Sequence, residues 1–188
     1  PRSFSPAPKG FAPQSLSKWF AAEDPVVAVP AEFSEVSVAA RGFFAMEFLL
    51  YDDRISQLGD DAYRCSLIQA VANDINRNAD AILTDWQSTY ATLMRTPSPE
   101  GPYTTDLAAV AELFKALDTG LQFNEEARLG RPLGTFDKPR PRRAEARRSG
   151  RSLQNISVSL SSLEQLASIL SAQSPSPSDN LTAAFESA

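Results

Sequence analysis

The chain has 188 residues, of which 43% are apolar, enough for one sizeable domain or two small ones. It has no histidine and one cysteine, which excludes imidazole catalysis, His-ligated zinc, thiolate clusters and an internal disulfide. The net charge of −5 is uneven, because residues 128–151 hold nine Lys or Arg against two acidic residues. The longest apolar run falls well short of the roughly 20 residues of a membrane span, so we expect a protein that is not transmembrane.

The first part of the chain predicts an irregular arm followed by two helices. It begins at Pro1 without an initiator Met, so we expect a processed or shortened chain, which allows for a removed export signal. Four prolines in residues 1–13 predict the arm, and a short helix over residues 14–23 ends before Pro25. A second helix is predicted from about Pro30 to Asp52, with Gly42 in its middle at a close contact with a neighbouring helix.

The remaining elements are long helices as well. Apolar residues three or four apart predict a helix of some 34 residues from Asp61 to Met94, with Asp74 and Arg77 in its polar intervals. Further helices are predicted over residues 105–127 and 142–172, and a short amphipathic one over residues 179–188. The fold class is therefore all-α, with long up-and-down helices forming a helical bundle. We expect two packed halves, approximately residues 1–103 and 104–188.

Glu47 is the only polar side chain in the apolar run from Phe43 to Tyr51. A helix that is apolar on every side is a buried helix, so we expect this carboxylate to be enclosed. An enclosed carboxylate needs a cation, a metal, hydrogen-bond donors or a bound proton. The candidate partners are Arg64, Arg147 and Arg151.

Two separated blocks of the sequence resemble the imelysin-like proteins. Residues 38–52 are similar to the central motif of that family, and residues 128–134 followed by 144–153 are similar to its second block. The resemblance covers roughly residues 4–170. It implies a bacterial exported protein of two packed helical bundles, periplasmic or anchored to the outer membrane as a lipoprotein and linked to iron acquisition. It also implies a functional site where the two halves meet, and N-terminal helices that this chain lacks.

The sequence departs from the family motif at one position. Founding members are described as peptidases with a Gly-x-His-x-x-Glu motif, and this chain has Gly42 and Glu47 but Phe44 in the His position. His and Glu three residues apart share a helix face and together hold a metal, whereas Phe has no lone pair. We therefore expect a non-enzymatic ligand-binding protein. The alternatives are a metallopeptidase-like or carboxylate-only metal-binding protein, and a structural protein with a buried Glu–Arg pair.

The candidate ligand contacts come from both blocks: Glu47, Tyr51, Arg64, Arg147, Ser149 and Arg151. Arg147 and Arg151, four apart near the start of the predicted helix 142–172, favour an anionic group. No cofactor is expected beyond a hard ion such as Fe³⁺, Ca²⁺ or Mg²⁺ on Glu47. We expect a small ligand or metal ion and a periplasmic or membrane iron-uptake protein as partners. Nucleic acid is not expected, since prolines interrupt the basic segment and no aromatic residue follows Phe136 within it.

Overall fold

A computed structural model describes residues 11–172 of the chain. Its regular elements in that range are all helical, which confirms the all-α class; the one β contact is an isolated bridge between Thr135 and Lys138. The chain divides into two compact units, unit 1 up to Asp85 and unit 2 from Trp86 onward, each described here by itself. None of the helices described is long and apolar enough to cross a membrane. The helix predicted over residues 179–188 lies outside the described range.

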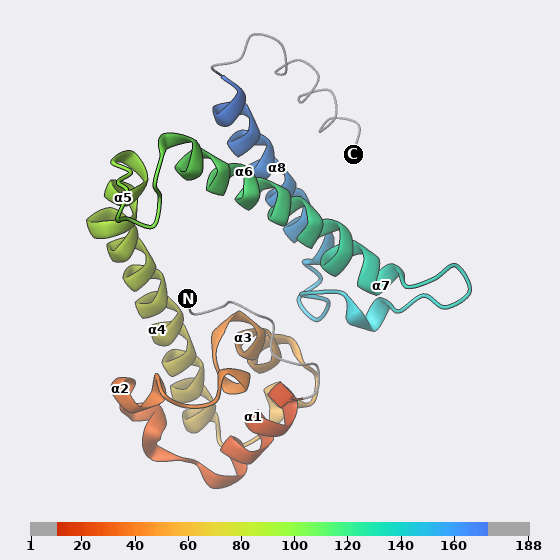
Figure 1. Cartoon of the computed structure of the whole chain (residues 1–188). Coiled ribbons are helices and arrows are strands. Elements are labelled where there is room, and N and C mark those ends of the chain that lie inside the picture. Colours follow the sequence, from red (N-terminus) through yellow and green to blue (C-terminus); the bar gives the residue numbers. More distant parts are fainter. Residues whose placement is uncertain (1–10, 173–188) are drawn as a thin grey trace. The chain divides into compact units, whose positions relative to one another are not determined.

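Unit 1 is built from four α-helices joined by short 3-10 turns (Figure 1). The helices are α1 (Phe11–Ala22), α2 (Pro30–Phe33), α3 (Gly42–Tyr51) and α4 (Asp61–Asp85). The turns are Pro25–Ala28, Val38–Ala40 and Ile55–Gln57. The single helix predicted from Pro30 to Asp52 is therefore wrong, because the chain is helical there only in separate pieces.

The break before α3 is caused by two residues. Arg41 is extended, with φ −129° and ψ 166°, and Gly42 follows with φ +73°. Residues with a Cβ rarely adopt such a positive φ, whereas glycine does so without strain. A Cβ added at Gly42 would meet no atom within 4 Å, so the predicted close contact with a neighbouring helix is wrong. Gly42 is therefore needed for its backbone conformation, which allows α3 to begin at this residue.

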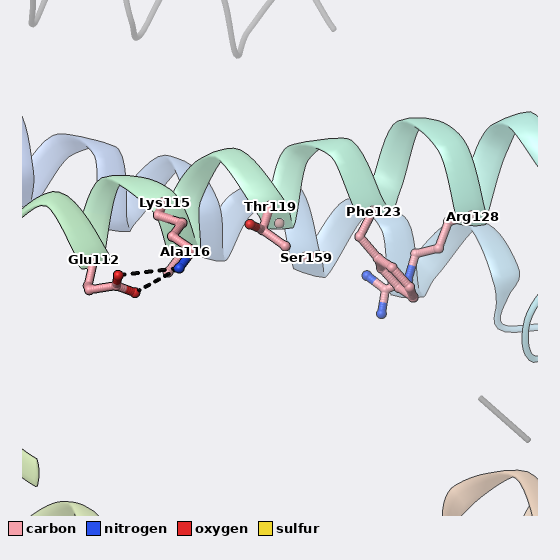
Figure 2. Close-up of a pocket in the computed structure, with 8 residues that line it drawn as sticks. Glu112, Lys115, Ala116, Thr119, Phe123, Arg128 and Ser159 are labelled. Atoms are coloured by element: carbon pink, nitrogen blue, oxygen red, sulfur yellow. Dashed lines mark hydrogen bonds and ion pairs between the residues drawn. The ribbon is translucent and has the colours of Figure 1, made fainter. Parts of the chain in front are cut away.

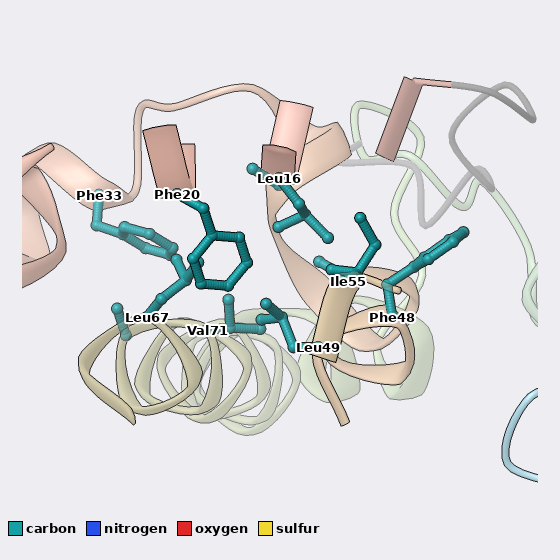
Figure 3. Close-up of a cluster of buried hydrophobic side chains, with 11 residues drawn as sticks. Leu16, Phe20, Phe33, Phe48, Leu49, Ile55, Leu67 and Val71 are labelled. Atoms are coloured by element: carbon teal, nitrogen blue, oxygen red, sulfur yellow. The ribbon is translucent and has the colours of Figure 1, made fainter. Parts of the chain in front are cut away.

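The core of unit 1 is hydrocarbon (Figure 3). Side chains from α1, α2, α3, α4 and the turn at Ile55 meet in one cluster, and the Trp19 and Phe33 rings pack edge to face with centroids 5.7 Å apart. Its largest enclosed side chains are Leu16, Phe33, Leu49, Ile55, Leu67 and Val71. Burial of such side chains typically stabilises a fold by about 1.5 to 3 kcal/mol each. Unit 1 thus holds α3 firmly against α4.

The helical run that begins with α4 continues past Asp85 through a π-helical turn, Trp86–Tyr90, and α5 (Ala91–Arg95). Its extent agrees with the helix predicted over residues 61–94. The apolar residues that predicted this helix are not buried along its whole length, because Ile82, Trp86 and Tyr90 are exposed. The Trp86 and Tyr90 rings stack with centroids 6.4 Å apart.

Unit 2 is centred on α6 (Asp106–Gln122) and α8 (Ser152–Ser171), which run side by side in opposite directions (Figure 1). Thr105 caps α6, its hydroxyl accepting a hydrogen bond from the Ala108 amide at 3.1 Å. After α6 come a π-helical segment, Phe123–Gly130, the short α7 (Arg131–Leu133) and a 3-10 turn, Pro141–Arg143. Several apolar side chains of α6 are exposed, for example Leu107 and Phe114.

Candidate functional site

The motif helix α3 is covered on one side only. Ala45, Phe48 and Leu49 are buried in the core, while Phe43, Phe44, Leu50 and Tyr51 are exposed, and Glu47 is half-buried between the two sets. The prediction that Glu47 is enclosed is therefore wrong for the chain as described. An all-apolar run indicates burial but does not say which side of the helix is covered.

Phe44, Glu47 and Tyr51 follow one another along the same face of α3, one helical turn apart. The Phe44 side chain is 39% exposed and Tyr51 is 53% exposed, so this face presents aromatic surface beside a carboxylate. Position 44 stands outside the core cluster of unit 1. An imidazole at this position would therefore lie beside the Glu47 carboxylate at the surface.

Arg64, one of the predicted partners of Glu47, has its described contacts at the start of α4. Its guanidinium pairs with Asp61 and donates a hydrogen bond to the Leu58 carbonyl at 3.0 Å. These contacts fasten the turn before α4 to the helix. They give Arg64 a local structural role in addition to the predicted one, which stays a prediction.

A buried ion cluster that the sequence did not predict is centred on Asp74 of α4. Asp74 Oδ2 accepts a hydrogen bond from Arg41 Nε at 2.9 Å, and Asp74 Oδ1 accepts one from Arg77 Nη2 at 2.6 Å. The Asp74 side chain is only 2% exposed, and Arg77 also donates to the Pro30 carbonyl at 2.7 Å. The cluster thus joins the residue before the motif glycine to α4 and to the start of α2.

A signal for this cluster is present in the sequence. Asp74 follows Ala70 by four residues and Val71 by three, so it lies within the buried stripe of α4 and not in a polar interval. A carboxylate at a core position needs a cationic partner. Arg41 and Arg77 are the partners that the structure gives it.

In unit 2 the second sequence block is held together by Arg128. Arg128 Nε donates to Glu145 Oε2 at 2.7 Å, and Nη1 donates to Asn124 Oδ1 at 3.1 Å. The same guanidinium lies 5.1 Å above the centre of the Phe123 ring, a cation–π contact. Arg128 therefore connects the π-helical segment to the turn that precedes α8.

The network continues from Asn124 and Glu145 to α8. The Asn124 amide donates to Ser159 Oγ and to the Gly120 carbonyl, both at 2.9 Å, and Ser152 Oγ donates to the Glu145 carbonyl at 2.5 Å. Asn124 is buried, yet its amide groups are hydrogen-bonded. π-Helical turns recur at functional sites, and this one carries Asn124, which contacts α8, and Arg128, which contacts Glu145 before α8.

Arg147, Ser149 and Arg151 do not lie on a helix, because α8 begins only at Ser152. The prediction that Arg147 and Arg151 share a helical face is therefore wrong. The segment before α8 is a series of turns with Ala146 at φ +50° and Gly150 at φ +70°, and the Ala146 carbonyl accepts from the Arg151 amide and from Ser149 Oγ. Both arginine side chains are exposed, so they remain accessible cations.

An open groove of about 490 Å³ lies along unit 2 (Figure 2). Its lining comes mainly from α6 and the π-helical segment, with Phe123 and Arg128 at one end and Ser159 from α8. The charges in it are compensated, since Lys115 Nζ bridges both carboxylate oxygens of Glu112 at 3.3 Å and Arg128 pairs with Glu145. This neutral groove does not by itself select an ion.

The predicted contacts fall into two sets. Glu47, Tyr51 and Arg64 belong to unit 1, and Arg147, Ser149 and Arg151 to unit 2. The joint site predicted from both sets stays a prediction. Within residues 11–172, no three His, Cys, Asp or Glu side chains are grouped so as to hold a metal ion.

The comparison with protein families gives one match. The model named Imelysin, a peptidase family, matches residues 6–188. Neither the curated proteins nor the solved structures include one that matches the chain. The family match covers both sequence blocks, the one before and within α3 and the one between the π-helical segment and α8.

Proposed function

Because the chain belongs to the imelysin family, we propose that it is an exported ligand-binding protein that takes part in iron-linked uptake in the periplasm without hydrolysing peptides. The observation that carries this proposal is Phe44 in the His position of the family motif, in a chain with no histidine at all. The periplasmic location, with or without a lipid anchor, and the iron-linked role rest on the family resemblance.

The chemistry of a zinc peptidase supports the non-enzymatic half of the proposal. Such an enzyme holds zinc with about three side chains, commonly imidazoles, and activates a water on the open position. Phe44 offers no lone pair to replace the imidazole, and the chain has no other histidine to recruit. Glu47 alone retains the negative charge of the motif.

The exposed face of α3 supports the ligand-binding half. Phe44 and Tyr51 provide aromatic surface on either side of the half-buried Glu47 carboxylate, and the Tyr51 hydroxyl adds a hydrogen-bond group. A face of this kind suits a small ligand with a cationic centre or a bound hard metal ion. In unit 2, the exposed Arg147 and Arg151 suit an anionic group, with Ser149 supporting the turn that carries them.

The experiment compares metal content and peptidase activity in wild type, Glu47→Gln, Phe44→His and the double variant Phe44→His/Glu47→Gln. Wild type is expected to show no peptide hydrolysis. Phe44→His is expected to gain zinc or cobalt binding, because position 44 is at the surface and shares the face of Glu47. The double variant, which has the imidazole without the carboxylate, is the matched control and should lose this gain.

Two outcomes would overturn the proposal. Peptide hydrolysis by wild type that disappears in Glu47→Gln would make the protein an enzyme. Fractionation of cells that express the whole gene, with the protein found only in the cytoplasm, would remove the export step. Binding of Fe³⁺ or Ca²⁺ by wild type and its loss in Glu47→Gln would support the carboxylate-only metal alternative.

A further inference from the structure

Unit 1 contains a second cavity, away from the motif face of α3. It has a volume of about 330 Å³ and lies between α4 and the segment that contains the Pro25–Ala28 turn and α2. This size is at the lower end of the range of small-molecule sites, about 300 to 1,000 Å³. The family motif contributes no residue to its lining.

The cavity has two chemically different walls. The apolar wall is formed by Val27, Pro30 and Phe33, with Ala70 beside them on α4. The polar wall is one face of α4, where Gln69 and Asn73 present amide groups. A ligand that fits both walls has a hydrocarbon body and a polar head group.

The charge of the cavity selects the head group. Its two charged lining residues are Asp74 and Arg77, and Arg41 lies behind Asp74. Both Asp74 oxygens accept hydrogen bonds from these arginines, so two positive charges face one negative charge. The cluster therefore carries a net charge of +1 and is neutralised by a monoanion.

The Arg77 guanidinium is held in place for such a contact. It donates to Asp74 Oδ1 at 2.6 Å and to the Pro30 carbonyl at 2.7 Å, which fixes the plane of the group. A guanidinium has five N–H donors, so three remain, and the side chain is 43% exposed. Holding a donor group before the ligand arrives lowers the entropy cost of binding.

We infer that this cavity binds a small monocarboxylate with a hydrocarbon body, its carboxylate on Arg77 and its body against Val27 and Pro30. Arg77 is the residue that contacts the ligand directly. Asp74 and Arg41 are positioning residues that hold the guanidinium. The inference is independent of the site on α3.

The chain offers a reporter for the test. Cys65 is the only cysteine and is exposed, and its sulfur lies 3.6 Å from the Gln69 amide nitrogen, one turn from the cavity. A trifluoromethyl label on Cys65 therefore senses binding by ¹⁹F NMR. The probes are benzoate and isovalerate, with benzyl alcohol and isoamyl alcohol as neutral counterparts.

The inference predicts saturable shifts with the carboxylates at millimolar concentration, and weaker or no shifts with the alcohols. Arg77→Gln is expected to weaken carboxylate binding at least about tenfold, because a charge-assisted hydrogen bond is lost. Arg95→Gln, an exposed arginine at the end of α5, is the matched control and should bind as wild type does. Ser66→Phe places a ring in the cavity from its exposed rim and should abolish binding.

Three results would overturn the inference: no saturable shift with either carboxylate, equal affinity for acids and alcohols, or unchanged binding in Ser66→Phe. If Arg77→Gln fails to fold by circular dichroism, Ser66→Phe decides the outcome, since Ser66 lies outside the core cluster. The binding test leaves α3 unchanged, so a negative result does not affect the proposed function. In the same way, the assays of the Glu47 and Phe44 variants do not test the inference about this cavity.

Discussion

The two units differ in what lies at their centres. In unit 1 the centre is hydrocarbon, with Leu16, Phe33 and Leu67 fully enclosed. In unit 2 the buried apolar side chains described are small or few, Ala109, Ile156 and Ala167, and a hydrogen-bonded network around Asn124 joins the elements. Truncation of a core side chain leaves a cavity, whereas removal of a hydrogen-bonding group leaves its buried partners unsatisfied. Unit 1 is therefore expected to be most sensitive to lost side-chain volume, and unit 2 to lost hydrogen bonds.

The two tryptophans allow this difference to be measured unit by unit. Trp19 packs against Phe33 in unit 1, and Trp86 stacks on Tyr90 in unit 2. Fluorescence of Trp19 in a Trp86→Phe background reports unfolding of unit 1. Fluorescence of Trp86 in a Trp19→Phe background reports unfolding of unit 2.

The largest expected effect is that of Leu67→Ala in unit 1. Leu67 is 0% exposed, and its truncation leaves a cavity in the core, so we expect the free energy of unfolding to fall by about 2 to 5 kcal/mol. Urea unfolding followed through Trp19 measures the loss. Leu107→Ala, at a leucine that is 78% exposed on α6, is the control and should change the value by less than about 0.5 kcal/mol. Equal losses for the two variants would show that unit 1 has no dominant core.

The next largest effect is that of Asp74→Asn, which disrupts the one buried ion cluster described in the otherwise hydrocarbon core of unit 1. The change leaves Arg41, largely buried, without its carboxylate, and removal of one buried partner typically costs about 3 to 5 kcal/mol. Because Arg77 is partly exposed and water replaces some of the contact, we expect about 2 to 3 kcal/mol in the same urea experiment. Asp80→Asn, at an exposed aspartate on the same helix, should be close to neutral.

In unit 2, Asn124→Ala removes hydrogen bonds to the Gly120 carbonyl, Ser159 and Arg128. A loss of about 1 to 3 kcal/mol is expected, because buried groups are left unsatisfied. Urea unfolding followed through Trp86 measures it, and Gln122→Ala, an exposed amide two residues earlier, serves as control. A neutral Asn124→Ala would mean that the network does not hold unit 2 together.

Gly42→Ala should cost about 1 to 2 kcal/mol, because a Cβ strains the backbone at φ +73° although it meets no neighbouring atom. Gly42→Asn should cost less and Gly42→Val more, since asparagine tolerates positive φ and a β-branched residue does not. Thermal unfolding of the three variants gives the order. Similar losses in all three would point to packing and not to backbone conformation.

The smallest effect concerns pH. Burial raises the pKa of the Tyr63 phenol, and the negative charge of Asp24 adds to this, while its hydrogen bond to the Asp24 carbonyl acts in the opposite direction. The unfolded chain then loses this proton at a lower pH than the folded chain, so the stabilisation is present below about pH 10 and is lost as the pH rises beyond it. The alkaline decline in melting temperature should be shallower in Tyr63→Phe. An identical decline would remove Tyr63 as its source.

The helix content and the extents of α4 and α6 follow from apolar spacing, so they were predictable from the sequence. The breaks were not, because extended Arg41 and the late start of α8 depend on local backbone angles that a periodic pattern does not encode. The same holds for the site. The motif identified the positions of Phe44 and Glu47, but the exposed side of α3 depends on which neighbours cover it.

The surface position of Phe44 has an evolutionary consequence. A side chain that does not belong to the core can be exchanged without compensating changes elsewhere, so we expect a single substitution at this position to be enough to gain or lose an imidazole beside Glu47. The scaffold would be inherited unchanged while its chemistry is lost or regained. Among descendants of one ancestor, we therefore expect residue 44 to be substituted more often than Leu49, which lies five positions further along the same helix and is buried in the core.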